Sequence, residues 1–186
     1  MLEFNAEKHE YLLEGKKIPS VTEILQALHN FQFVSKDKLE TAKNNGSNIH
    51  KALEYYDKNL LSEKSINDYQ NIIKIWEDFI KHYDAKIKHI ELSLYSPRGF
   101  AGTIDRIIEV KNKNILVDIK TGKPNKIMPL QTMAYKLLCQ DNNIKIYKRW
   151  CVFFQEDKYI VSEHKNDFQD EQIFTSCLNI YNFLRR

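Results

Sequence analysis

The sequence contains only three cysteines, and none of them belongs to a CxxC pair. A zinc ribbon or a disulfide framework needs paired, closely spaced cysteines, so both are excluded. Glycine and proline are also scarce, with five and four residues. There is no internal repeat and no low-complexity segment, which excludes repeat architectures. The chain is therefore expected to be an ordinary globular protein.

Long apolar runs are absent as well. No secretory signal pattern follows Met1, and no run is long enough to span a membrane. We therefore expect a reducing, cytoplasmic location without a membrane partner. The net charge is only +3, with 42% hydrophobic and 28% charged residues. This mild basicity is compatible with a polyanionic partner but is not evidence for one, since an AT-rich genome accounts for part of it.

The 186 residues suit one domain with its own core. A hairpin is expected within residues 1–19, with Glu14 to Lys17 ending its second strand. Ser20-Val-Thr-Glu23 forms a capping box that opens a helix over 21–28, and Phe31 and Phe33 then dock onto the core. Periodicity predicts further helices over 36–44, 49–56, 65–83, 130–139 and 167–184, and strands over 87–95, 100–110, 115–120, 145–155 and 159–163. This order predicts a mixed α/β fold.

One strand carries charges in an apolar setting. Val117-Asp118-Ile119-Lys120 alternates, so Asp118 and Lys120 point to one face of the strand. Buried charges are costly unless they are paired or bound to something. Carboxylates that hold a divalent cation beside a lysine are one arrangement that explains such residues. Asp105 is expected on the adjacent strand, where hydrogen bonding between the strands would fix its distance from Asp118.

Other polar residues have plain structural explanations when each is taken alone. A salt bridge at a strand end explains Asp105 followed by Arg106. A helical histidine such as His50 is more often packed or solvent-facing than a ligand. The remaining candidates are an outward-facing glutamate on the first core strand, Glu91, and two residues that are four apart on one helix face, Gln131 and Tyr135.

Taken together, in their order along the sequence, these candidate residues indicate a function more specifically than any one of them does alone. It reads Gly46-x-x-x-His50, Glu91, Gly102-x-x-Asp105, Asp118-x-Lys120-Thr-Gly122 and Gln131-x-x-x-Tyr135. It resembles the RecB-like exonuclease branch of the PD-(D/E)XK nuclease superfamily over roughly residues 46–135, and the segment 19–25 looks like small phage or prophage members. The resemblance implies a restriction-endonuclease-like core, in which helices flank a mixed central sheet. One nuclease domain would then comprise an N-terminal hairpin and helix extension (1–35), a helical part (36–84), the catalytic α/β core (85–165) and a C-terminal helix (166–186).

The resemblance also implies roles for these residues. Asp105, Asp118 and His50 would ligate metal, and the carbonyl of Ile119 would complete the coordination. Lys120 would be the catalytic lysine. Three further residues would act nearby: Glu91 as an acidic residue of the first core strand that supports the metal ligands, and Gln131 and Tyr135 at the edge of the active site.

The implied cofactor is one or two ions of Mg²⁺ or Mn²⁺, which lower the pKa of a water and polarise the phosphate. An imidazole ligand shifts the preference toward Mn²⁺. Many relatives hold an iron–sulfur cluster through four cysteines. Here the three cysteines, Cys139, Cys151 and Cys177, are wrongly spaced, so no cluster is expected.

The implied partner is DNA, either single-stranded or an end-bearing duplex, with a recombination or single-strand-binding protein as a further candidate. Arg98, Lys123, Lys126 and Tyr135 are the expected nucleic-acid contacts, although an ordinary solvated surface explains the basic residues equally well. Tyr135, Phe100 and Tyr95 would stack on bases if the substrate is single-stranded, whereas as core aromatics they need no such role.

The sequence therefore favours a metal-dependent deoxyribonuclease that acts on DNA ends in phage or bacterial DNA recombination, repair or processing. One alternative is a structure-specific nuclease that cuts flaps or branches. The other is a non-catalytic protein that binds nucleic acid or a partner through a vestigial nuclease fold. The complete set of His50, Asp105, Asp118 and Lys120 argues against a vestigial site.

Overall fold

The computed structural model describes residues 1–5, 10–29 and 48–185. Its N-terminal part is a small antiparallel sheet of β1 (Leu2–Asn5), β2 (Glu10–Leu13) and β3 (Lys16–Ile18), in that order. The expected hairpin is thus extended by a third strand, and the expectation that Glu14 to Lys17 end the second strand is wrong. Glu14 and Gly15 both have positive φ, at 51° and 77°. Two such residues form a tight hairpin turn that sends the chain back as β3.

The main sheet has five strands in sequence order. They are β4 (Lys86–Ser96), β5 (Phe100–Val110), β6 (Lys113–Lys120), β7 (Lys148–Phe154) and β8 (Tyr159–His164). Neighbouring strands are antiparallel except for β6 and β7, which are parallel. A parallel pair needs a crossover connection, and the helix α5 (Met128–Asp141) lies in it.

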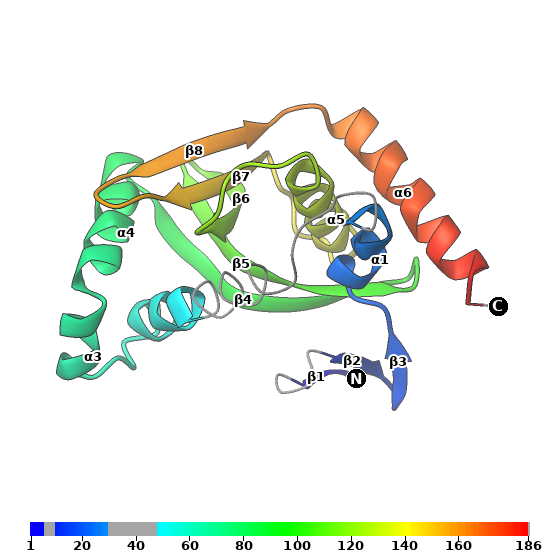
Figure 1. Ribbon diagram of the computed structural model, residues 1–186, viewed down its shortest axis with the longest axis horizontal. Helices are drawn as coiled ribbons and strands as arrows, with labels where there is room; N and C mark the ends of the chain where they lie inside the picture. The colour runs from blue at the N-terminus through cyan, green and yellow to red at the C-terminus, as the bar shows by residue number, and fades with distance from the viewer. Residues whose placement is uncertain (6–9, 30–47, 186) are drawn as a thin grey trace.

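Helices cover both faces of this sheet (Figure 1). On one face α1 (Val21–His29), α5 and α6 (Asp167–Phe183) contact one another and share a core cluster with Leu116. On the other face the helical residues 48–57 and α4 (Gln70–His82) share a second cluster with Val117 and Ile119. The predicted mixed α/β class, with a mixed sheet flanked by helices and an N-terminal antiparallel sheet, is confirmed. None of the helices in the described parts of the chain is both long and apolar enough to cross a membrane.

The prediction of a single helix over 65–83 is wrong in one respect, because the segment forms two helices. The first, α3 (Glu63–Asp68), ends at Tyr69, whose φ of −112° and ψ of 16° lie outside the helical range, and α4 follows. Apolar residues on both sides of the break pack against the same core cluster, so hydrophobic periodicity does not reveal it. The predicted helix over 36–44, Phe31, Phe33 and Gly46 lie outside the described residues.

The capping box at the start of α1 is confirmed. The Ser20 amide donates to Glu23 Oε2 at 2.8 Å, and the Glu23 amide donates to Ser20 Oγ at 3.0 Å. The same segment attaches the N-terminal sheet to the core, because the Ala101 amide donates to the Pro19 carbonyl at 2.9 Å. The hydrogen bond between Ala101 and Pro19 therefore holds the start of α1 next to β5.

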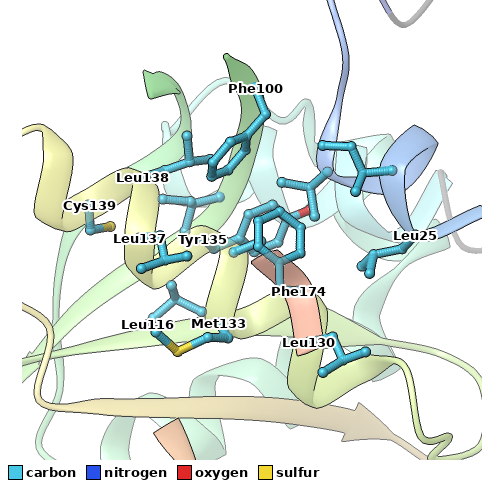
Figure 2. Close-up of a cluster of buried hydrophobic side chains, with 14 of the residues drawn as sticks. Leu25, Phe100, Leu116, Leu130, Met133, Tyr135, Leu137, Leu138, Cys139 and Phe174 are labelled. Carbon is cyan, nitrogen blue, oxygen red and sulfur yellow. The ribbon is translucent and has the colours of Figure 1, made fainter. Parts of the chain in front are cut away.

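Close packing of α5 on β5 explains Gly102. A Cβ at this position would lie 2.9 Å from Tyr135 Cε1 and 3.1 Å from both Leu138 Cδ1 and Val21 Cγ2. Tyr135 and Leu138 lie among the buried side chains of the first cluster, shown in Figure 2. Only glycine leaves the space that this approach needs.

Replacing Gly102 with alanine is expected to lower the free energy of unfolding by about 1–3 kcal/mol, because the added methyl group overpacks the core. Urea denaturation followed by circular dichroism measures the change. Gly122→Ala is the matched control, since nothing lies within 4 Å of a Cβ at Gly122. Equal effects of the two substitutions would show that close packing is not the reason for Gly102.

Candidate metal centre

The two central strands separate at the candidate site. Backbone pairing of β5 with β6 runs from the hairpin turn to Arg106 and Val117, and Asp105 and Asp118 lie just beyond that pair. The two carboxylates thus lie on adjacent strands, as expected, but the backbone pairing that was to fix their distance stops one position short of them. Instead, the Ile119 amide donates to Asp105 Oδ2 at 2.7 Å. This bond satisfies a buried backbone donor and ties the Asp105 side chain to β6.

Asp118 and Lys120 share one face of β6, as the alternation predicts. Lys120 Nζ lies 2.7 Å from Asp118 Oδ2, and the Cys151 thiol on β7 donates to the same oxygen at 3.3 Å. Burial raises the pKa of Asp118, while the adjacent lysine opposes the shift. Burial disfavours the charged Lys120, but the carboxylates of Asp118 and Asp105 outweigh it and raise the pKa of the lysine. Lys120 is thus held as a cation.

Three potential metal ligands from three elements meet beside this pair. His50 comes from the helical residues 48–57, Glu91 from β4 and Asp105 from β5, and one ligand atom of each lies within 4.8 Å of the others. His50 Nδ1 is 3.5 Å from Asp105 Oδ2. Octahedral coordination of Mg²⁺ at 2.0–2.1 Å places adjacent donors about 3 Å apart, so a small contraction would suffice. Two carboxylates and an imidazole are a donor set that fits Mg²⁺ or Mn²⁺.

Glu91 occupies an unusual backbone position for a strand residue. Its φ is +48°, in the left-handed region that favours glycine. The pairs on either side in the β4–β5 register place it opposite Asp105. Left-handed conformations of this kind are strained and cluster at functional sites. An alternating strand would present Glu91 in an outward row, whereas the structure places its carboxylate among the candidate ligands.

The charges at the three ligands influence one another strongly. Burial disfavours protonated His50, but the adjacent Asp105 carboxylate outweighs it and raises the pKa of His50 to about 9. In spite of burial, the positive charge of His50 holds the pKa of Asp105 well below its usual range. Burial and then the charge of Asp105 raise the pKa of Glu91. These opposed shifts mark a concentration of negative charge that a cation would stabilise.

Gln131 and Tyr135 lie together on α5, and the Gln131 amide donates to the Tyr135 hydroxyl at 3.0 Å. Burial, together with the nearby charges of Asp118 and Asp105, raises the pKa of Tyr135 well above its usual value. Tyr135 is only 6% exposed, and Phe100 is fully buried. Neither ring presents a face on which a base could stack, so the structure does not support that role.

The expected nucleic-acid contacts fall into two groups. Lys123 and Lys126 are exposed in the segment that leads from β6 to α5, a few residues beyond Lys120. Arg98 lies in the turn between β4 and β5, where it pairs with Asp141 and Glu171, each at 3.4 Å. The structure therefore engages Arg98 with α5 and α6 and does not bring it to the metal centre.

Sequence reasoning missed two residues beside the site. Arg106 was considered only in the alternative explanation of Asp105 as a member of a strand-end salt bridge. Successive strand residues point to opposite faces, and Arg106 pairs with Asp57 and Glu91. The sequence did offer one signal for Arg106, which is a charged residue in the middle of an apolar strand. Tyr11 shares a hydrogen bond of 2.8 Å with Thr103, two residues before Asp105. Nothing in the sequence shows that the N-terminal sheet lies there.

Comparisons with known proteins give only distant likenesses. No family model and no curated protein matches the chain. The crystal structure of a "Putative exonuclease" from Eubacterium rectale aligns with 92% of this chain and 75% of its own, at 11% identity and a TM-score of 0.46. The crystal structure of SSO0001 aligns with 89% of this chain and 84% of its own, at 12% identity and a TM-score of 0.37. Likenesses of this size establish neither a family nor an activity.

Proposed function

We propose that the protein is a metal-dependent nuclease that hydrolyses phosphodiester bonds of DNA from free ends. The observation that supports this most is the convergence of His50, Glu91 and Asp105 next to the Asp118–Lys120 pair. The fold brings these residues together from four separate segments of the chain. Their order along the sequence is also that of the RecB-like branch, to which we assign the protein within this proposal.

Each residue has a chemical task in this proposal. His50, Glu91 and Asp105 would hold Mg²⁺ or Mn²⁺, and Asp118 and the Ile119 carbonyl would be further ligands. The bound ion supplies a water of lowered pKa and a polarised phosphate. Asp118, whose side chain is 2% exposed, holds Lys120, whose side chain is 20% exposed. Lys120 can therefore present its charge to the phosphate, where negative charge develops during hydrolysis.

The surface beyond this site would carry the DNA. Lys123 and Lys126 are placed to contact phosphates of a strand that leaves the metal centre. Such contacts carry no sequence information, which suits a nuclease that acts from DNA ends rather than at a specific sequence. A role in phage or bacterial recombination or repair, with a single-strand-binding or recombination protein as a partner, belongs to the same proposal.

Cleavage of labelled linear DNA, flapped DNA and covalently closed circles, with Mg²⁺, Mn²⁺ or EDTA, tests this function. We expect linear DNA to be degraded only with a divalent metal, and closed circles to stay intact. Efficient cutting of circles would overturn action from ends, and preferential cutting of flaps would favour a structure-specific nuclease. No cleavage of any substrate would favour a non-catalytic binding protein. Asp118→Asn, purified in parallel, controls for contaminating nucleases.

A further inference from the structure

A series of partly buried hydrogen bonds leads from α4 to the metal centre. Trp76 Nε1 donates to Asp57 Oδ1 at 2.9 Å, and Arg106 Nε donates to Asp57 Oδ2 at 2.7 Å. Arg106 Nη1 then donates to Glu91 Oε1 at 2.9 Å. These hydrogen bonds thus connect α4, the helical residues 48–57, β5 and β4 in space, although Asp57 and Arg106 are 49 positions apart in sequence.

This arrangement is energetically costly. The side chain of Arg106 is 0% exposed and that of Asp57 is 3% exposed. Buried ion pairs often add little net stability, because both charges lose their hydration. In addition, Arg106 Nη2 is buried and has no hydrogen-bond partner among the described residues. An unsatisfied buried donor is a further cost that calls for an explanation.

Both residues of the Arg106–Glu91 pair carry an energetic cost. Arg106 leaves one buried nitrogen unsatisfied, and Glu91 adopts a left-handed backbone within a strand. A pair selected for stability alone would avoid both penalties. Their coincidence at a single contact indicates that the contact is retained for another reason.

Arg106 touches two of the three candidate ligand residues. Its Nη1 donates to the Glu91 carboxylate and also to the backbone carbonyl of Asp105. A guanidinium presents its donors in a rigid, planar fork, so it fixes both the distance and the orientation of its partners. Asp57 accepts a hydrogen bond from Nε of this guanidinium, and Trp76 in turn donates a hydrogen bond to Asp57.

We propose that Arg106 is a positioning residue that, with Asp57 and Trp76 behind it, orients the Glu91 carboxylate for a divalent cation. The inference rests on the metal centre of the proposed function and deepens it by assigning these residues to the support of one ligand. Hydrogen-bond partners of ligating carboxylates commonly account for a 10–100-fold difference in metal affinity. We therefore expect Arg106 to control metal affinity through Glu91.

A second buried arginine, Arg149, is a matched control for a purely structural role of Arg106. Arg149 is also 0% exposed, and it forms ion pairs with Asp167 and Asp170 of α6. It contacts none of the three candidate ligands. If Arg106 were only a buried structural cation, substitution of either arginine would have the same consequences for the metal centre.

Isothermal titration of the metal-free protein with Mn²⁺, without nucleic acid, tests the inference. Arg106→Lys keeps the charge, but a single ammonium does not reproduce the fork that joins Asp57 to Glu91. We expect it to weaken Mn²⁺ binding by about 10–100-fold, and Arg149→Lys to leave the affinity unchanged. Circular dichroism confirms that both variants are folded. Should Arg106→Lys fail to fold, Asp57→Asn removes the anchoring charge from the intact Arg106 and is expected to weaken binding as well.

A double-mutant comparison shows whether Arg106 acts through Glu91. We expect Glu91→Gln with Arg106→Lys to bind Mn²⁺ as weakly as Glu91→Gln alone, since the intermediary is already lost. Wild-type affinity in Arg106→Lys, an equal loss in Arg149→Lys, or fully additive losses would overturn the positioning role while leaving the metal centre intact. Absence of Mn²⁺ binding by the wild-type protein would overturn the metal centre and this inference together.

Discussion

Replacing Lys120 with alanine is expected to reduce the rate of DNA cleavage by about 10²–10³-fold, the typical effect of removing one group that stabilises charge in a transition state. Lys120 is a partly exposed cation of the site, and buried Asp118 holds its ammonium at 2.7 Å. Alanine removes the charge that would face the phosphate. Rates on labelled linear DNA at saturating Mn²⁺ measure the effect.

Two comparisons make this result specific to the site. Lys74→Ala removes an exposed lysine of α4 and is expected to cleave at the wild-type rate. Asp118→Asn removes the partner that orients Lys120, so it is expected to cause a comparable loss of cleavage. Circular dichroism verifies the fold, because Lys120→Ala leaves a buried carboxylate without its cation. A folded Lys120→Ala variant with the wild-type rate would show that the site is assigned wrongly.

Replacing Trp76 with alanine is expected to lower the free energy of unfolding by about 3–5 kcal/mol. Trp76 is 1% exposed, and its ring stacks on Phe79 with the ring centroids 5.2 Å apart. The substitution opens a cavity under the main sheet and removes a donor from buried Asp57. Domains of this size are commonly stable by only about 5–15 kcal/mol, so the variant would lose much of its stability.

The substitution Trp76→Phe distinguishes the contribution of the indole hydrogen bond to stability from that of the buried ring volume. Phenylalanine retains most of the apolar contact with Phe79, but it leaves Asp57 Oδ1 without the indole N–H. We expect a loss of about 1–3 kcal/mol, as for one unsatisfied buried acceptor. Urea denaturation measures both variants. Near wild-type stability of Trp76→Ala would contradict the central place of this residue in the second core cluster.

The fold class was predictable because its signals are local. The strand predicted over 100–110 coincides with β5, and the capping box marks the start of α1 correctly. Alternation along β6 also indicates which face carries Asp118 and Lys120, because a strand's side-chain period of two is a property of the backbone. The order of motifs indicated which residues to look for at the site.

The arrangement of the site was not predictable in the same way, because it depends on contacts between distant segments. Nothing local shows that Glu91 adopts a positive φ, or that pairing of β5 with β6 ends before Asp105. The partners of Arg106 come from two other elements, so its charge alone did not identify them. Arg98 was a plausible DNA contact by sequence position, yet tertiary packing engages it elsewhere.

The separation of β5 from β6 gives the protein a built-in spectroscopic reporter. Within a regular ladder, the Ile119 amide would report only on its backbone partner, but here it is bonded to a carboxylate oxygen of Asp105. The chemical shift and the solvent exchange of this one amide proton therefore depend on how that side chain is engaged. An isotope-labelled sample would let the state of the proposed metal centre be followed from a single backbone resonance, without any modification of the site.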